Sequence, residues 1–61
     1  MSAENETYQE GQRLLKELTA LRNDVLNINA SDTQCKEQAL RLIERSRAEL
    51  REALTVLAGL V

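Results

Sequence analysis

Apolar residues in the first half of the chain recur at alternating steps of four and three. The row with this spacing is Leu14, Leu18, Leu21, Val25 and Ile28. Such steps place successive side chains on one side of an α-helix, whereas a strand would need strict alternation of apolar and polar residues, which this stretch lacks. The pattern therefore predicts a helix over about 5–27, with this row as its contact seam.

Three residues beside this row are spaced by seven: Tyr8, Leu15 and Arg22. We therefore expect the buried stripe to be wider than the row itself. Gly11 falls on the row, and a glycine in a helix interior costs roughly 1 kcal/mol relative to alanine. Either the helix is weak before Gly11 or a neighbouring backbone comes close, and we favour a frayed or kinked start.

Residues 27–32 form the run richest in turn and capping residues, near the middle of the chain. Asn, Ser and Asp favour turns and helix starts because their side chains hydrogen-bond to nearby backbone groups. Ser31 and Gln34 have the spacing of a capping box, and Asp32 is a competing cap. The run therefore predicts a turn between two helices.

The second half of the chain is rich in good helix formers from 32 to 58, and Gly59 is the expected stop. Two neighbouring rows of this helix are apolar or small: Ile43, Leu50 and Leu57 in one, and Ala39, Ser46, Ala53 and Leu60 in the other. Small side chains allow a partner helix to approach closely. Further apolar residues extend this surface on both sides: Leu40, Leu54 and Val61, and Leu42 and Val56. One antiparallel partner helix cannot cover such a wide surface.

The predicted fold is all-α, a two-helix antiparallel hairpin over about 5–27 and 32–58, in one domain of residues 1–61 with 1–4 frayed. A chain of 61 residues gathers little core by itself, and the single cysteine allows no internal disulfide. Self-association is the remaining way to bury the leftover apolar surface. We therefore expect a homo-oligomeric, coiled-coil-like helical bundle.

Composition narrows the function classes. The absence of histidine and the single Cys35 argue against an enzyme, a metal site and a cofactor. A net charge of -2 gives no global positive field to attract nucleic acid or a membrane surface. Acidic Glu4 and Glu6 do not fit a secretory signal, so we expect a cytoplasmic protein in which Cys35 is a free, packed thiol.

Two arginines interrupt apolar rows and are candidate ligand-binding residues. Arg47 lies midway between Leu40 and Leu54 on the second helix, and Arg22 follows Leu15 on the first. An arginine at the margin of a buried stripe either lays its stem over the core or presents its donors to an anion in an interface pocket. The sequence leaves both interpretations open.

Tyr8 is the only aromatic residue. A lone tyrosine beside a seam is usually a packed ring with a solvated hydroxyl. In an oligomer, several copies of Tyr8 would instead form a platform on which nucleobases stack, for roughly 1 to 3 kcal/mol per base. Tyr8 is therefore the third candidate ligand-binding residue.

The segment from Arg47 to Leu54, Arg-Ala-Glu-Leu-Arg-Glu-Ala-Leu, with its continuation through Val56 to Val61, resembles a phage protein family. The family is the small helical anti-CBASS sponges. The resemblance implies a short helical hairpin that oligomerises and sequesters cyclic oligonucleotide immune signals between subunits without cleaving them. It also implies that Tyr8 and Arg22 correspond to an aromatic and a basic residue of the family's first helix.

The resulting hypothesis is a non-enzymatic sponge that holds a cyclic di- or trinucleotide between subunits, in the cytoplasm of an infected bacterium if the chain is phage-encoded. Tyr8 would stack on a base, and Arg22 or Arg47 would face phosphate. The alternative is an oligomeric adaptor or regulator that binds a host protein through exposed helix faces. The acidic charge balance argues against a third class, an RNA-binding hairpin dimer resembling ROP.

Overall fold

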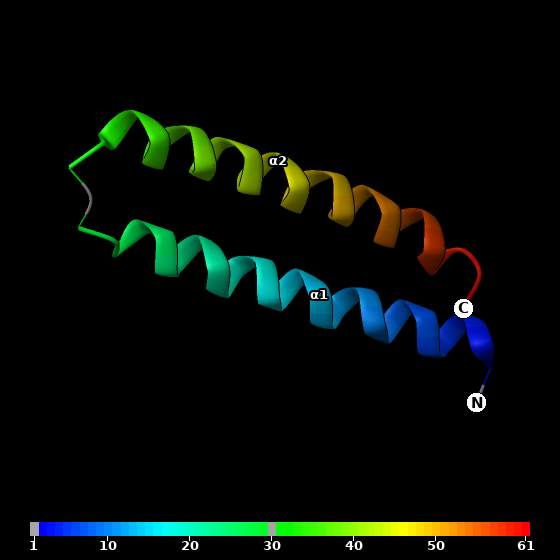
Figure 1. The fold of residues 1–61 in the computed structure, drawn as a ribbon. Coiled ribbons are helices and arrows are strands. Elements are labelled where there is room, and N and C mark those ends of the chain that lie inside the picture. Colours follow the sequence, from blue (N-terminus) through cyan, green and yellow to red (C-terminus); the bar gives the residue numbers. More distant parts are fainter. Residues whose placement is uncertain (1, 30) are drawn as a thin grey trace.

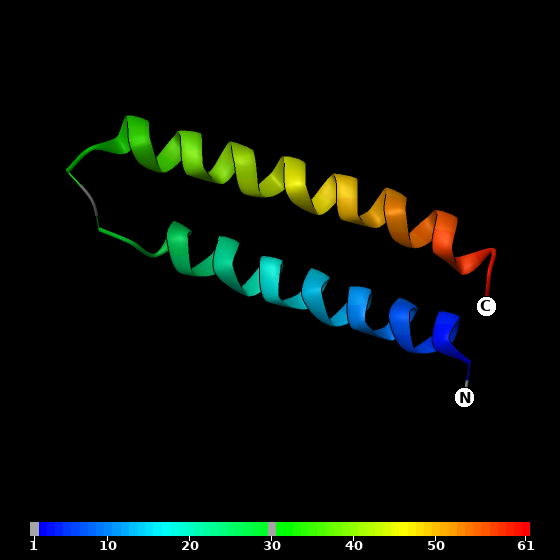
Figure 2. The same ribbon diagram turned by 45° about the vertical axis from the view of Figure 1, so that its right-hand side comes forward.

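The computed structural model describes residues 2–29 and 31–61, and these residues form two α-helices and no strand. Helix α1 spans Ala3–Leu26 and helix α2 spans Thr33–Ala58. The helices lie side by side and antiparallel, so that both termini are at the end opposite the turn (Figure 1, Figure 2). Both predicted helices are confirmed, with boundaries within two residues of those expected. The expected fraying of 1–4 stays a prediction.

Each helix begins at a side-chain cap. The Ser2 hydroxyl accepts a hydrogen bond from the Asn5 backbone N–H at 3.2 Å. At α2 the predicted Ser31 capping box is wrong, because the cap is Asp32, whose carboxylate accepts from the Cys35 backbone N–H at 3.1 Å. An ionised carboxylate also interacts favourably with the positive end of the helix dipole, which a serine hydroxyl does not. The expected stop at Gly59 is confirmed, since Gly59 is the C-cap of α2.

The seam of α1 differs from the predicted one. The buried and half-buried residues of α1 fall mainly on two lines, Tyr8, Leu15 and Arg22, and Gly11, Leu18 and Val25, with Asn5 and Thr19 half-buried beside them. Leu14, Leu21 and Ile28, which we expected on the seam, are between 44% and 51% exposed. The predicted and the observed seams both contain the line of Gly11, Leu18 and Val25. They differ in the second line, which is Leu14, Leu21 and Ile28 in the prediction and Tyr8, Leu15 and Arg22 in the structure. One partner helix can cover only one of these two second lines.

The seam of α2 follows a regular heptad: Lys36, Leu40, Ile43, Arg47, Leu50, Leu54 and Leu57. Leu54 is 6% exposed and is the only apolar side chain in the buried class among the described residues. The predicted row of small residues is not the seam, because Ser46 and Ala53 are exposed. The surface suited to close helix packing therefore remains uncovered in the single hairpin.

Gly11 marks a close approach of the two helices. A Cβ atom added to Gly11 would lie 2.5 Å from Cδ2 of Leu54. Helix α1 runs without interruption through this position, so the frayed or kinked start that we favoured is wrong. The close neighbour is the Leu54 side chain of α2. Leu54 is buried in the space that a side chain at position 11 would otherwise fill.

The single hairpin buries little of its surface. Its accessible surface is 4758 Å², whereas a compact monomer of the same mass exposes about 4,000 Å². Its Cα radius of gyration is 14.5 Å, against about 10.5 Å for a compact domain of this length. No helix among the described residues has the length and apolar character needed to cross a membrane.

Candidate functional site: an arginine cluster across the seam

Arg47 occupies a core position of the α2 seam, one heptad after Leu40 and one before Leu54. Its side chain is only 12% exposed, because the stem lies in the seam. Its Nη1 donates to Oε1 of Glu44 at 2.6 Å. Its Nε is buried and has no hydrogen-bond partner among the residues that the structure describes. A buried donor without a hydrogen-bond partner lowers the stability of the fold. The presence of an arginine at this seam position therefore calls for an explanation.

Arg22 reaches the same carboxylate from the other helix. Its Nε lies 3.6 Å from Oε1 of Glu44, so one carboxylate oxygen is shared by guanidinium groups of α1 and α2. Arg51, one heptad after Glu44, adds a third positive charge to the surroundings of this carboxylate. Three cations around one anion leave two net positive charges here, on a chain whose total charge is -2.

The hydrogen bond from Arg47 holds the pKa of Glu44 below its ordinary value of 4.5, and the charges of Arg47, Arg22 and Arg51 lower it further. A lowered pKa in the folded state means that the ionised carboxylate stabilises the hairpin above pH 4.5 and that this stabilisation is lost as the pH falls through the folded-state pKa. Because Glu44 is exposed, the effect is screened by solvent.

We expect the free energy of unfolding of the wild type to fall between pH 5 and pH 3 more steeply than that of Glu44→Gln. Chemical denaturation followed by circular dichroism at a series of pH values measures both profiles. The glutamine variant is the control for other carboxylates, including Asp32, whose pKa is also lowered by its hydrogen bonds from Cys35. Parallel profiles would show that Glu44 does not couple the helices electrostatically.

The arginine cluster has the chemistry to bind an anion. Guanidinium groups present several donors in a planar fork that matches phosphate oxygens. In the single hairpin the cluster holds its own anion, Glu44, on an open surface. A shallow depression elsewhere on α2 is lined by Gln34, Glu37, Gln38 and Arg41, nearer the turn. It lies outside the arginine cluster.

The structure places the three predicted ligand residues in two separate regions. Arg22 and Arg47 meet through Glu44. Tyr8 is half-buried on the same seam but precedes Arg22 by fourteen residues of one continuous helix. At 1.5 Å per residue, the separation along the axis is about 21 Å. A small ligand that contacts both Tyr8 and Arg22 would therefore need them from different copies of the chain.

Cys35 is exposed, so the expectation that it packs is wrong. Its thiol donates to the Asp32 carboxylate at 3.1 Å, and this hydrogen bond raises the pKa of the thiol. Cys35 therefore stays protonated at neutral pH and is a weak nucleophile. Among the described residues, no group of three or more His, Cys, Asp or Glu side chains is arranged to hold a metal ion.

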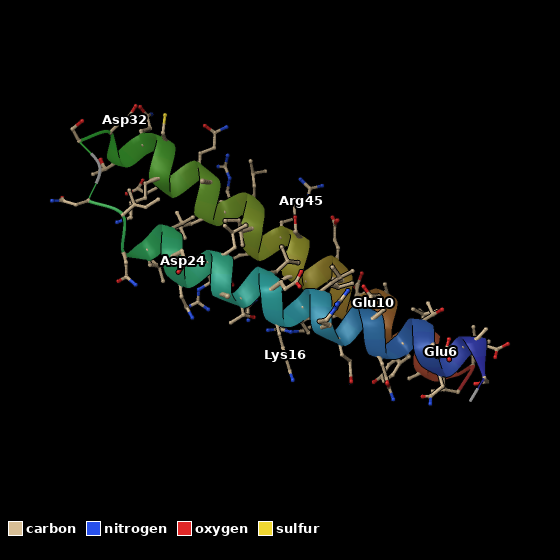
Figure 3. The ribbon with its side chains drawn as sticks, turned by 60° about the horizontal axis from the view of Figure 1, so that its bottom comes forward. Glu6, Glu10, Lys16, Asp24, Asp32 and Arg45 are labelled. Carbon is tan, nitrogen blue, oxygen red and sulfur yellow. The ribbon has the colours of Figure 1, made fainter. Side chains whose placement is uncertain are left out.

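Sequence reasoning missed Glu44 and Arg51. A signal for Glu44 was present, since it precedes Arg47 by three residues and so lies one turn away on the same side of a helix. Its contact with Arg22 depends on the register between the helices, which the sequence pattern did not fix. The outer charges form separate pairs, such as Arg45 with Glu49 at 3.3 Å. Figure 3 shows Lys16 and Arg45 pointing outward from opposite helices.

Comparisons of the chain with models of protein families, with curated proteins and with solved structures found no match.

Proposed function

We propose that the chain is a non-enzymatic, homo-oligomeric helical protein that captures a cyclic oligonucleotide through phosphate contacts from Arg22 and Arg47. The observation that carries the proposal is the convergence of these two guanidinium groups on one oxygen of Glu44, with Nε of Arg47 buried and unpaired. A phosphate that replaced or joined Glu44 would satisfy donors that the hairpin leaves incompletely used.

Local charge supports this proposal. A chain with a net charge of -2 has no general attraction for polyanions, but the cluster of three arginines and one glutamate is positive. Small cyclic phosphodiesters carry few charges and need a local donor set more than a long basic surface. In the sponge hypothesis, base stacking comes from Tyr8 of another copy, because Tyr8 is too far from the arginines within one hairpin.

The test is thermal melting of the purified protein with a panel of cyclic di- and trinucleotides. A ligand that binds only the folded oligomer should raise the melting temperature by several degrees when present well above its Kd. Arg47→Leu should abolish the shift. Arg41→Leu is the matched control, since it removes the same charge from the surface depression on α2. A panel without any shift, or an equal loss in both variants, would contradict the proposal.

One observation favours a second candidate function, an adaptor that binds a host protein. Large apolar residues such as Leu42, Val56 and Leu60 are between 51% and 74% exposed in the single hairpin. Contiguous exposed apolar surface marks protein interaction sites. An adaptor would form a stoichiometric complex with one host protein and show no melting shift with nucleotides, whereas a sponge shows the opposite pattern.

A further inference from the structure

We propose that one face of the hairpin is a symmetric dimer interface in which the turns of the two copies lie at the same end. This face, here called the apolar face, consists of Leu14, Leu21 and Ile28 of α1, Ala39, Ser46, Ala53 and Leu60 of α2, and the bordering Leu42 and Val56. The inference rests on the homo-oligomeric part of the proposed function and adds the surface and the orientation.

The residues of the apolar face share one side of the hairpin because the helices are antiparallel. In each helix the main row of this face consists of residues that come one position before a seam residue in the sequence. Leu21 comes directly before Arg22, and Ser46 comes directly before Arg47. In an antiparallel helix pair these two rows fall on the same side, and the rows on the far flanks of the seams share the opposite side. The contact of Arg22 with Glu44 marks that opposite side.

The area of the apolar face matches what a stable dimer needs. The hairpin measures 48 by 16 Å across its helices, that is, about 770 Å², and it exposes about 750 Å² more surface than a compact monomer of its mass. Stable interfaces bury about 800 Å² per partner. Six large residues of the apolar face are between 44% and 74% exposed, so most of this area is apolar: Leu14, Leu21, Ile28, Leu42, Val56 and Leu60.

The register between the helices sets which residues lie level with each other. Gly11 packs on Leu54, and Arg22 meets Glu44, so residues whose numbers add to about 65 are level along the hairpin. By this rule each large residue of the α1 row is within two residues, about 3 Å, of the level of one small residue of the α2 row. The pairs are Leu14 with Ala53, Leu21 with Ser46, and Ile28 with Ala39.

Shape selects the same-end orientation. A two-fold axis parallel to the helices keeps every residue at its level and places α1 of one copy over α2 of the other. Each large side chain of the α1 row then faces a small residue of the partner, which is how packed layers fill space. An axis across the helices would place α1 over α1 and α2 over α2, so that large residues meet large ones and small residues meet small ones.

The charge pattern favours the same orientation. Glu10, Glu17 and Asp24 form an acidic row on α1 along the border of the apolar face. In the opposite-end arrangement the acidic rows of the two α1 helices would lie side by side and repel. In the same-end arrangement this row runs along the row of Leu42 and Val56 on α2 of the partner, whose one acidic residue, Glu49, is level with Glu17, so fewer like charges meet. The arginine cluster stays on the outer side of the dimer in either arrangement. In the same-end dimer the Tyr8 copies also stay at their own level, about 21 Å along the axis from Arg22, so stacking of Tyr8 on a ligand held by the cluster would need a copy from outside this dimer.

The single native Cys35 allows a direct test, because it is exposed near the turn. Spin labels on Cys35 of the full chain give a distance by double electron–electron resonance. With helix axes 8 to 10 Å apart, the two Cα atoms lie across the diagonal of the same-end dimer, about 15 Å apart. In the opposite-end dimer the rise of 1.5 Å per residue places them about 40 Å apart. The short distance is the expected result, and the long one would overturn the orientation.

Sedimentation at micromolar concentration tests the face itself. The wild type should be a dimer, and Leu21→Glu should weaken dimerisation about 100-fold or more, because two carboxylates would be buried without partners. Ala20→Glu adds the same charge at an exposed position on the outer side of α1 and should leave the dimer intact. A monomeric wild type, or a dimer that tolerates Leu21→Glu, would overturn the inference. A dimer with the short distance that binds no nucleotide would instead contradict the proposed function alone.

Discussion

Replacing Leu54 by alanine is expected to lower the free energy of unfolding by about 2 to 5 kcal/mol. Leu54 is the one apolar side chain of the buried class among the described residues, and it fills the space left by Gly11. A folded chain of 61 residues has a total stability of about 3 to 9 kcal/mol. The variant should therefore be largely unfolded at concentrations where the wild type is folded.

Urea denaturation followed by circular dichroism, at one fixed chain concentration, measures this loss. Leu42→Ala is the matched control, since it removes the same atoms from an exposed side chain of the same helix. At low concentration, where copies do not pair, the control should change stability by less than about 1 kcal/mol. A similar loss in both variants would mean that Leu54 is no more buried than Leu42 in solution.

Gly11→Ala tests the same contact from the other side. In the wild-type background the helix propensity gained, about 1 kcal/mol, is opposed by the approach of the new Cβ to Leu54 at 2.5 Å. In the Leu54→Ala background that obstacle is gone, so the full gain should appear. The double-mutant cycle should therefore give a coupling energy of about 1 kcal/mol. Additive effects would show that the two residues do not touch.

The helices and the turn could be predicted because their signals are local. Capping residues, glycine and the steps of three and four act within one or two helical turns. The choice of cap was less certain, because Ser31 and Asp32 are neighbours and either can accept from the first turn. The structure selects Asp32, whose carboxylate accepts both the backbone N–H and the thiol of Cys35.

The seam of α1 could not be predicted from hydrophobicity, because the wrong row is the more apolar one. The predicted row adds Leu14, Leu21 and Ile28 to the shared line, whereas the true seam adds Tyr8 and Arg22 together with Leu15. Gly11 lies on the line that both rows share, so its packing on Leu54 does not distinguish them, whereas the contact of Arg22 with Glu44 belongs to the true seam alone. This contact depends on the register between helices that are distant in sequence.

The position of Arg47 in the seam also explains why the candidate site could be predicted only in part from the sequence. The sequence identified Arg22 and Arg47 as interruptions of apolar rows, which is a one-dimensional signal. Their meeting at Glu44 needs the antiparallel register, and the separation of Tyr8 from them follows from the straight course of α1. Residues that break a local pattern without an evident gain in stability are expected at functional sites.

Arg47→Leu is therefore expected to raise the free energy of unfolding, by about 1 to 4 kcal/mol. Leucine keeps the apolar contacts of the arginine stem between Leu40 and Leu54 and removes a buried Nε without a partner. Glu44 loses its closest partner but remains solvated and near Arg22. The stabilisation should be measurable as a higher urea midpoint with an unchanged slope.

Arg41→Leu is the control, because it makes the same replacement at an exposed position and should change stability by no more than about 0.5 kcal/mol. A more stable Arg47→Leu that no longer binds nucleotide would separate binding from folding, since lost binding would then not reflect an unfolded chain. It would also show that the arginine is kept in the seam at a cost in stability, as residues of binding sites often are. A variant less stable than the wild type by 1 kcal/mol or more would instead make Arg47 a structural residue, held by its ion pair with Glu44.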